Sequence, residues 1–147
     1  MSLADVCAEL GDVTRAGELY ALMLPYAGMM VGPFLVTICQ GAADRGLGTL
    51  ATVLERWDEA DKHFASAVRL EEACQAPPLL AFTLKCWGAM LLRRNRPGDH
   101  ARARELLARA VSLAERFGMP EMARWVAEQA ASVPSPAHVE EERATEH

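Results

Sequence analysis

Histidines are the first residues of this sequence whose type could support catalysis or metal binding. They are His63, His100, His138 and His147. No two of them stand three or four residues apart, the spacing at which one face of a helix offers two imidazoles to a metal ion. We therefore expect no metal site, no cofactor and no catalytic histidine, and we expect His63 to lie on the surface.

Carboxylates and a cysteine offer two further kinds of chemistry. Asp58, Glu59 and Asp61 could form a general acid–base pair, but acidic residues in the first turn of a helix also complement its dipole and cap its free N–H groups. Cys86 lies beside Trp87 with no histidine nearby in the sequence to activate it, and cysteine is a residue type that proteins bury. Both patterns favour a structural role, and we predict that the chain is not an enzyme.

Arginines form the one basic concentration in the chain. They could contact an anion, or they could complement helix ends and cover an outer helix face, which we favour. The six are Arg93, Arg94, Arg96, Arg102, Arg104 and Arg109. The whole chain carries 15 Lys and Arg against 20 Asp and Glu, a formal charge of −5, which argues against direct nucleic-acid binding by phosphate neutralisation.

A repeated pattern indicates which elements position these residues. A small alanine recurs at spacings of 44 and 43 residues, and a large residue follows it one helical turn later. The three pairs are Ala16 and Tyr20, Ala60 and Phe64, and Ala103 and Leu107. Small and large residues on one helical face are what close helix–helix packing requires. An apolar helix with its own small residue precedes each copy, so the sequence predicts three helix–turn–helix units.

The ends of these helices are predicted from single residues. Asp58 and Asp99 are placed to cap the second helices of their units. Gly118 suits a helix C-terminus, and Pro120 suits the first turn of a closing helix that reaches about Ala131. We expect one domain over residues 1–133 and a mobile acidic tail over 134–147.

The repeated pattern resembles the tetratricopeptide repeat (TPR), a two-helix unit that stacks into a superhelix. The matching residues are Leu47-Gly48, Arg56-Trp57-Asp58-Glu59-Ala60, His63-Phe64, Ala67 and Leu70-Glu71. Glu55 stands where such repeats usually have glycine, so we expect a turn there without a positive φ. The resemblance implies an all-α, TPR-like α-solenoid of about three helix–turn–helix repeats plus a C-terminal capping helix.

The stretch from Gly46 to Met119 is similar, more specifically, to the repeat region at the C-terminus of large bacterial regulators. In those proteins a LuxR-type DNA-binding or adenylate/guanylate cyclase module and an ATPase domain precede the repeats. This chain contains no GxxxxGK[ST] phosphate loop, so the resemblance implies only the sensor or docking end. The implied function is a non-catalytic module for protein–protein or intramolecular regulatory contacts, within transcription regulation or signal transduction.

A binding groove follows from the same resemblance, because the first helix of each TPR-like unit lines the concave face. The residues expected there are Arg45, Thr49, Thr52, Phe82, Lys85, Ala89 and Arg93. Cations around an aromatic ring and two hydroxyls suit a protein or peptide partner with an acidic segment. Two alternatives are a small-molecule effector in the groove and a groove filled by neighbouring repeats.

An uncharged stretch of 25 residues runs from Leu19 to Ala43. Pro25, Gly28, Gly32 and Pro33 interrupt it, which argues against a membrane span. We expect an apolar face near the N-terminus that forms a homodimer or packs against a preceding domain. The expected interface residues are Met29, Met30, Val31 and Phe34. Four cysteines without a CxxC motif indicate reduced thiols and a cytoplasmic protein.

Overall fold

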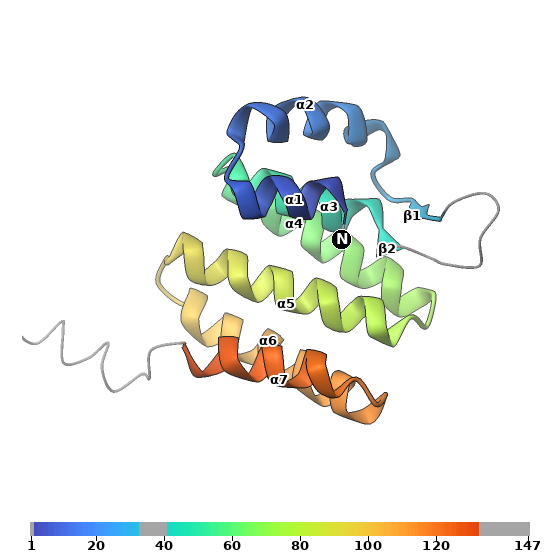
Figure 1. Cartoon of the computed structure of the whole chain (residues 1–147), viewed down its shortest axis with the longest axis vertical. Coiled ribbons are helices and arrows are strands. Elements are labelled where there is room, and N and C mark those ends of the chain that lie inside the picture. Colours follow the sequence, from blue (N-terminus) through green and yellow to red (C-terminus); the bar gives the residue numbers. More distant parts are fainter. Residues whose placement is uncertain (1, 33–40, 133–147) are drawn as a thin grey trace, which may run out of the picture.

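A computed structural model describes residues 2–32 and 41–132 of the chain (Figure 1). The described residues are all-α apart from one pair of two-residue strands. The elements, in order, are α1 (Leu3–Leu10), α2 (Val13–Met23), the 3-10 helix η1 (Leu24–Tyr26), β1 (Met30–Val31), β2 (Gly41–Ala42), α3 (Ala43–Val53), α4 (Trp57–Ala73), α5 (Pro77–Arg94), α6 (Asp99–Arg116) and α7 (Pro120–Ala131). Among these residues, no helix combines the length and the apolar character that crossing a bilayer requires.

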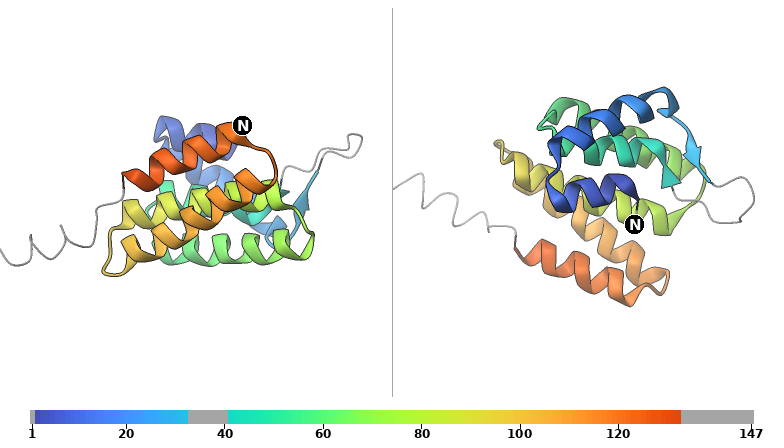
Figure 2. Two further views of the ribbon diagram at one scale, coloured as in Figure 1. Left: turned by 90° about the horizontal axis from the view of Figure 1, so that it is seen from below. Right: turned by 45° about the horizontal axis from the view of Figure 1, so that its top comes forward.

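The helices follow one another as antiparallel hairpins. Figure 1 and the right-hand view of Figure 2 show α1–α2, α3–α4 and α5–α6 in succession along the long axis, with α7 packed on α6 at the end. Contacts between neighbouring hairpins join α2 to α3, α4 to α5, and the first helices α1, α3 and α5 to one another in turn. The three hairpins and the closing helix agree with the predicted order of elements.

The repeated small and large residues are buried in all three hairpins. All six predicted residues are buried: the three alanines are 0% exposed, and Tyr20, Phe64 and Leu107 are at most 7% exposed. A Cβ added to Gly48 of α3 would lie 3.0 Å from three ring atoms of Phe64 in α4. A Cβ added to Gly88 of α5 would lie 2.9 Å from Cγ of Leu107 in α6. The second and third hairpins therefore pack by the same contact, a glycine against the large residue of the partner helix.

Two predicted helix caps are wrong. The helix α4 begins one residue before Asp58, with Arg56 as its N-cap and no side-chain capping bond, so Asp58 and Glu59 complement the helix dipole without capping the helix. The N-cap of α6 is Gly98, and Asp99 is the first helical residue. The carboxylate of Asp99 instead accepts hydrogen bonds from the Arg94 guanidinium, at 2.6 and 2.8 Å, and from the backbone N–H of Arg96 at 2.9 Å.

The turn at Glu55 also differs from the prediction. Glu55 adopts a φ of 57°, and Gln75 and Asn95, which follow α4 and α5, have φ values of 51° and 53°. Left-handed backbone after the last helical turn ends a helix by giving its final carbonyls new N–H partners. Glu55 thus has the conformation that glycine favours, although it is not glycine.

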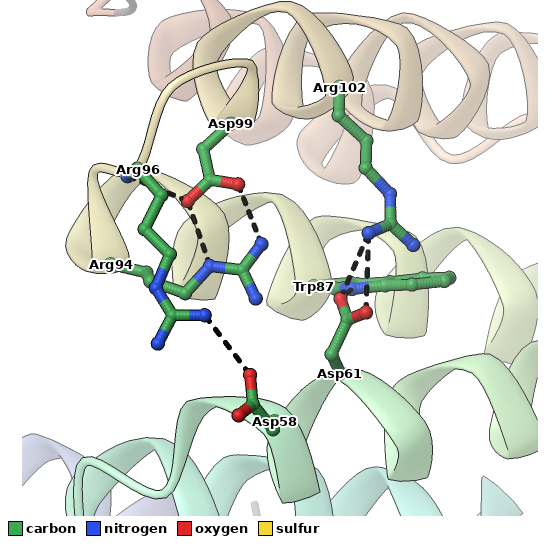
Figure 3. A network of polar contacts seen from close by, with 7 residues as sticks. All are labelled: Asp58, Asp61, Trp87, Arg94, Arg96, Asp99 and Arg102. Atoms are coloured by element: carbon green, nitrogen blue, oxygen red, sulfur yellow. Dashed lines mark hydrogen bonds and ion pairs between the residues drawn. The ribbon is translucent and has the colours of Figure 1, made fainter.

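Charged residues bind the second hairpin to the third (Figure 3). Asp61 of α4 accepts a 2.8 Å hydrogen bond from the indole N–H of Trp87 in α5 and a 3.1 Å bond from Arg102 in α6. The guanidinium carbon of Arg102 lies 4.5 Å from the centre of the Trp87 ring. One carboxylate therefore joins three helices, and the apolar contacts between the hairpins are supplemented by a partly buried polar link.

The strand pair was not predicted. Met30 pairs with Ala42 and Val31 with Gly41 in an antiparallel register. Ala42 also donates its N–H to Oε1 of the buried Glu71 in α4, at 3.2 Å. The pair thus anchors the start of α3 to α4.

Candidate functional site

The first helices of the hairpins enclose a cavity of about 890 Å³. Apart from Phe64 of α4, every lining residue belongs to α1, α3, α5 or α7 or is the N-cap of α1 or α7. All six predicted groove residues are in this lining: Arg45, Thr49, Thr52, Phe82, Lys85 and Arg93. Ala89, which the sequence placed with them, lines it too. The structure therefore brings the predicted residues together in one groove, here called the concave groove.

Helical periodicity explains why these side chains share a face. Arg45, Thr49 and Thr52 are one turn apart on α3, and Phe82, Lys85, Ala89 and Arg93 follow the same spacing on α5. The opposite sides of both helices are buried in the hairpin core. The two threonine hydroxyls donate to carbonyls of their own helix, Thr49 to Arg45 at 3.0 Å and Thr52 to Gly48 at 2.7 Å.

The side of the groove formed by α3 and α5, here called its floor, carries three cations, and Lys85 is one of them. Its ammonium lies over the ring of Trp125 from α7 and 5.4 Å from the centre of the Phe82 ring. Burial lowers the pKa of Lys85, while the carboxylates of Asp5 and Glu9 act in the opposite direction. The aromatic rings stabilise the cation but supply no hydrogen-bond acceptor, so a ligand carboxylate would find a partly desolvated ammonium.

Two arginines extend this positive floor. The Arg45 guanidinium lies 4.8 Å from the centre of the Phe82 ring. Burial raises the pKa of Glu71, and the charge of Arg45 acts in the opposite direction. Arg93 forms a 3.8 Å ion pair with Glu55, and both side chains are more than half exposed. Exposed pairs of this kind contribute little free energy, so Arg93 can exchange Glu55 for another carboxylate.

The walls of the groove differ from its floor, and the sequence did not predict them. On one side Asp5 and Glu9 of α1 add two negative charges, and on the other Met119, Met122 and Trp125 add an apolar surface from the start of α7. Trp125 is 50% exposed and its ring centre lies 6.4 Å from that of Phe82. The spacing of Met122 and Trp125 on one face of the closing helix was the available signal. The site thus combines a basic floor, an acidic edge and an apolar wall.

His63 is not the surface residue that the sequence predicts. Its Nδ1 lies 2.8 Å from Oδ1 of the buried Asp44, and its Nε2 lies 3.0 Å from the hydroxyl of Tyr20. That hydroxyl also donates to Oε2 of Glu59 at 3.0 Å. Burial and the bond to Glu59 raise the pKa of Tyr20 to about 12, so the phenol stays protonated.

The arrangement of these four side chains is structural. They connect α2, α3 and α4, and none of them lines the concave groove. A protonated, buried phenol is neither an activated nucleophile nor a base at neutral pH. The network fixes the first hairpin on the second, a role that no spacing in the sequence indicates.

Cys86 lines the groove but has the properties of a core thiol. Burial raises its pKa to about 11, so the reactive thiolate is scarce at neutral pH. Within residues 2–32 and 41–132, no group of three or more His, Cys, Asp or Glu side chains is arranged to hold a metal ion. His100 lies in the first turn of α6, and His138 and His147 fall outside the described residues.

The arginine cluster is largely engaged within the protein. Arg94 binds Asp99, Arg96 binds Asp58, Arg102 binds Asp61, and Arg109 binds Glu72. Arg93 and Arg94 occupy the last turn of α5, where a cation complements the helix dipole. These contacts agree with the structural interpretation of the cluster, and Arg93 alone among the six lines the groove.

The expected self-association residues lie near the N-terminal end of the stack. Met29 is 55% and Val31 39% exposed, Met30 is half-buried, and Phe34 lies outside the described residues. Further large apolar side chains on α1, α2 and η1 are exposed by 47 to 71%: Leu3, Leu10, Val13, Leu22, Leu24 and Tyr26. Only Phe117 and Trp125 of the other described hairpins reach comparable exposure, so the exposed apolar surface is concentrated at this end.

Comparison with known proteins adds no relative: no protein-family model, no curated protein and no solved structure matches the chain. Inferences about function therefore rest on the groove and on the repeated packing.

Proposed function

We propose that the chain is a non-catalytic helical-repeat module whose concave groove binds a protein or peptide segment rich in acidic side chains. The observation that carries the proposal is the position of Lys85, a partly buried cation on the floor of a groove lined by the first helices of successive hairpins. A carboxylate there would gain a charge-assisted hydrogen bond, and apolar side chains beside it would pack on Phe82, Met122 and Trp125.

A TPR-like relationship is part of this proposal. It is supported by the equivalent contacts of Gly48 with Phe64 and of Gly88 with Leu107, and by the positive φ of Glu55 at a position where such repeats usually have glycine. The corresponding biological role is the sensor or docking end of a larger bacterial signalling or transcription regulator, working in the cytoplasm without direct nucleic-acid or membrane contact.

Peptide titration tests the proposed binding. A fluorescently labelled peptide of alternating glutamate and leucine should bind the chain saturably, and K85E/R93E should weaken binding by at least about tenfold, or 1.4 kcal/mol. Arg45 is unsuitable for reversal, because its guanidinium lies beside the buried Glu71 and a new carboxylate there would disturb the fold.

The matched control is K62E, because Lys62 is the only other lysine of the sequence and lies on α4 outside the groove lining. It should bind the peptide like the wild type. Both variants should keep the helical circular dichroism. Equal affinity of K85E/R93E and wild type would remove the groove as the binding site.

A small-molecule effector is the second candidate. The cavity of about 890 Å³ falls within the range of about 300–1,000 Å³ that is typical of ligand pockets. Native mass spectrometry of the chain purified from cell extract distinguishes the two, because a retained effector adds a fixed mass of small-molecule size.

Self-association is a separate proposal, motivated by the exposed apolar residues of the N-terminal end. Exposed patches of this kind usually mark contact surfaces. A homodimer through α1, α2 and the β1 segment would cover Leu22 and Met29, and a preceding domain would cover the same surface in a longer protein.

A further inference from the structure

We infer that the acidic segment Glu140–Glu142 of this chain docks in the concave groove, so that the chain carries its own competitor for the acidic partner. The inference rests on the proposed function, because it uses the same groove. The segment would occupy the groove until an acidic partner displaces it.

Charge complementarity is the first argument. Residues 133–147 contain four glutamates and one arginine, with three of the glutamates adjacent. The floor of the groove presents Lys85 and Arg93. Arg93 meets Glu55 only at 3.8 Å on the surface. Lys85 lies against aromatic rings, and among the described residues the charges of Asp5 and Glu9 act on it without forming a salt bridge. A run of carboxylates is the ligand that these two cations would prefer.

Chain geometry is the second argument. Met122 and Trp125 place α7 along one side of the groove, and Figure 1 shows that α5 and α7 run in the same direction. The last turn of α7 therefore lies toward the end of the groove where α5 carries Arg93. The segment that follows Ser132 is therefore attached near the Arg93 end of the groove.

The reach of the segment is sufficient. Glu140 is eight positions after Ser132, and an extended chain spans about 3.3–3.6 Å per residue, or about 28 Å in total. Arg93 and Lys85 are eight helical residues apart, which at 1.5 Å per residue is about 12 Å. Pro134 and Pro136 disfavour continuation of the helix, so the chain can turn back toward the floor. The glutamates can thus contact both cations.

Zero-length cross-linking with a carbodiimide tests the docking on the full chain. The reagent joins an amine directly to a carboxylate, and Lys62 and Lys85 are the only lysines of the sequence. We expect Lys85 to form amides with Glu140–Glu142 at least about fivefold more often than Lys62 does, because only Lys85 lies in the groove. Links from Lys85 to Asp5 or Glu9, which line the same groove and whose charges act on Lys85, report independently that Lys85 reacts. A mixture of isotope-labelled and unlabelled chains separates links within one chain from links between chains.

A binding measurement gives a second readout. The variant E140Q/E141Q/E142Q should bind the labelled acidic peptide at least about threefold more tightly than wild type, since its competitor has lost its charge. The control E18Q/E105Q/E115Q removes the same charge from exposed side chains outside the groove and should leave the affinity unchanged.

The two proposals fail in different ways. Links from Lys85 to Asp5 or Glu9 without links to the tail, or tail links divided equally between Lys62 and Lys85, would overturn the docking while peptide binding could still hold. Peptide binding equal in wild type and the tail variant would likewise overturn it. Absence of peptide binding in every variant would overturn the proposed function, and the cross-links would then decide the docking alone.

Discussion

Replacement of Gly48 by alanine tests the packing that defines the hairpins. The new Cβ would lie 3.0 Å from three ring atoms of Phe64, a side chain that is 1% exposed. Because the ring is enclosed by the core, it cannot move aside without disturbing its neighbours. Gly17 provides the matched control, because it also lies inside a helix, and its added Cβ would meet only Leu54 Cδ2 at 3.9 Å, an ordinary contact.

The two substitutions should have opposite signs. Alanine in place of glycine inside a helix stabilises by about 0.8–1.0 kcal/mol when there is room, so Gly17→Ala should raise the free energy of unfolding by nearly that amount. At Gly48 the same gain is offset by overpacking, which costs about 1–3 kcal/mol. The expected net effect of Gly48→Ala is a loss of about 1 kcal/mol, and the two variants should differ by about 2 kcal/mol.

Urea denaturation followed by circular dichroism at 222 nm measures both variants. The midpoint should rise for Gly17→Ala and fall for Gly48→Ala, with an unchanged dependence on urea concentration. Combining Gly48→Ala with Phe64→Leu should cost less than the sum of the single changes, since the smaller side chain leaves space for the methyl group. Gly48→Ala as stable as Gly17→Ala would refute the close contact of α3 with α4.

Three further predictions concern two buried acids and the exposed apolar surface at the N-terminal end of the stack. Asp99→Asn should lower the free energy of unfolding by about 2 kcal/mol at pH 7. Because Arg94 lowers the pKa of Asp99 in the folded state, the difference from wild type, measured by urea denaturation, should shrink as the pH falls through the acid range. A pH-independent difference would contradict this. Glu71→Gln should show the reverse pH dependence. Burial raises the pKa of Glu71, so the wild type loses stability as the pH rises above the pKa of this glutamate in the unfolded chain. The glutamine variant should therefore be more stable than the wild type at neutral pH but not in acid. The chain should sediment as a dimer at micromolar concentration and Leu22→Glu should make it monomeric; a monomeric wild type whose Met29 resists oxidation would contradict an interface at that end.

The sequence predicted the elements that depend on regular helical spacing. Small and large residues one turn apart identified the three hairpins. The resemblance to TPR-like repeats assigned the groove to the first helix of each unit, and helical spacing then placed Lys85 and Arg93 on that side of α5. These features follow from local geometry, because residues three and four apart share one face of a helix.

The features that the sequence did not predict depend on contacts that helical spacing does not encode. His63 was expected on the surface because it adjoins Phe64, but Asp44 and Tyr20 come from other helices and enclose it. Asp99 was expected to cap its helix, but the nearby Arg94 guanidinium takes its carboxylate. Glu55 was expected to avoid positive φ from its residue type alone, although the packing of α3 against α4 determines that turn. In each case a specific contact or packing constraint overrides the preference of the residue type.

Mapping by nuclear magnetic resonance tests the central claim most directly. The labelled chain is titrated with the acidic peptide while backbone amide shifts are recorded. Binding in the concave groove predicts saturable shifts at Thr49, Lys85 and Ala89 and at the Trp125 indole, with the amides of α2 and α6 unchanged. Shifts centred on α2 and α6, or no saturable shift in the groove at any peptide concentration, would contradict it.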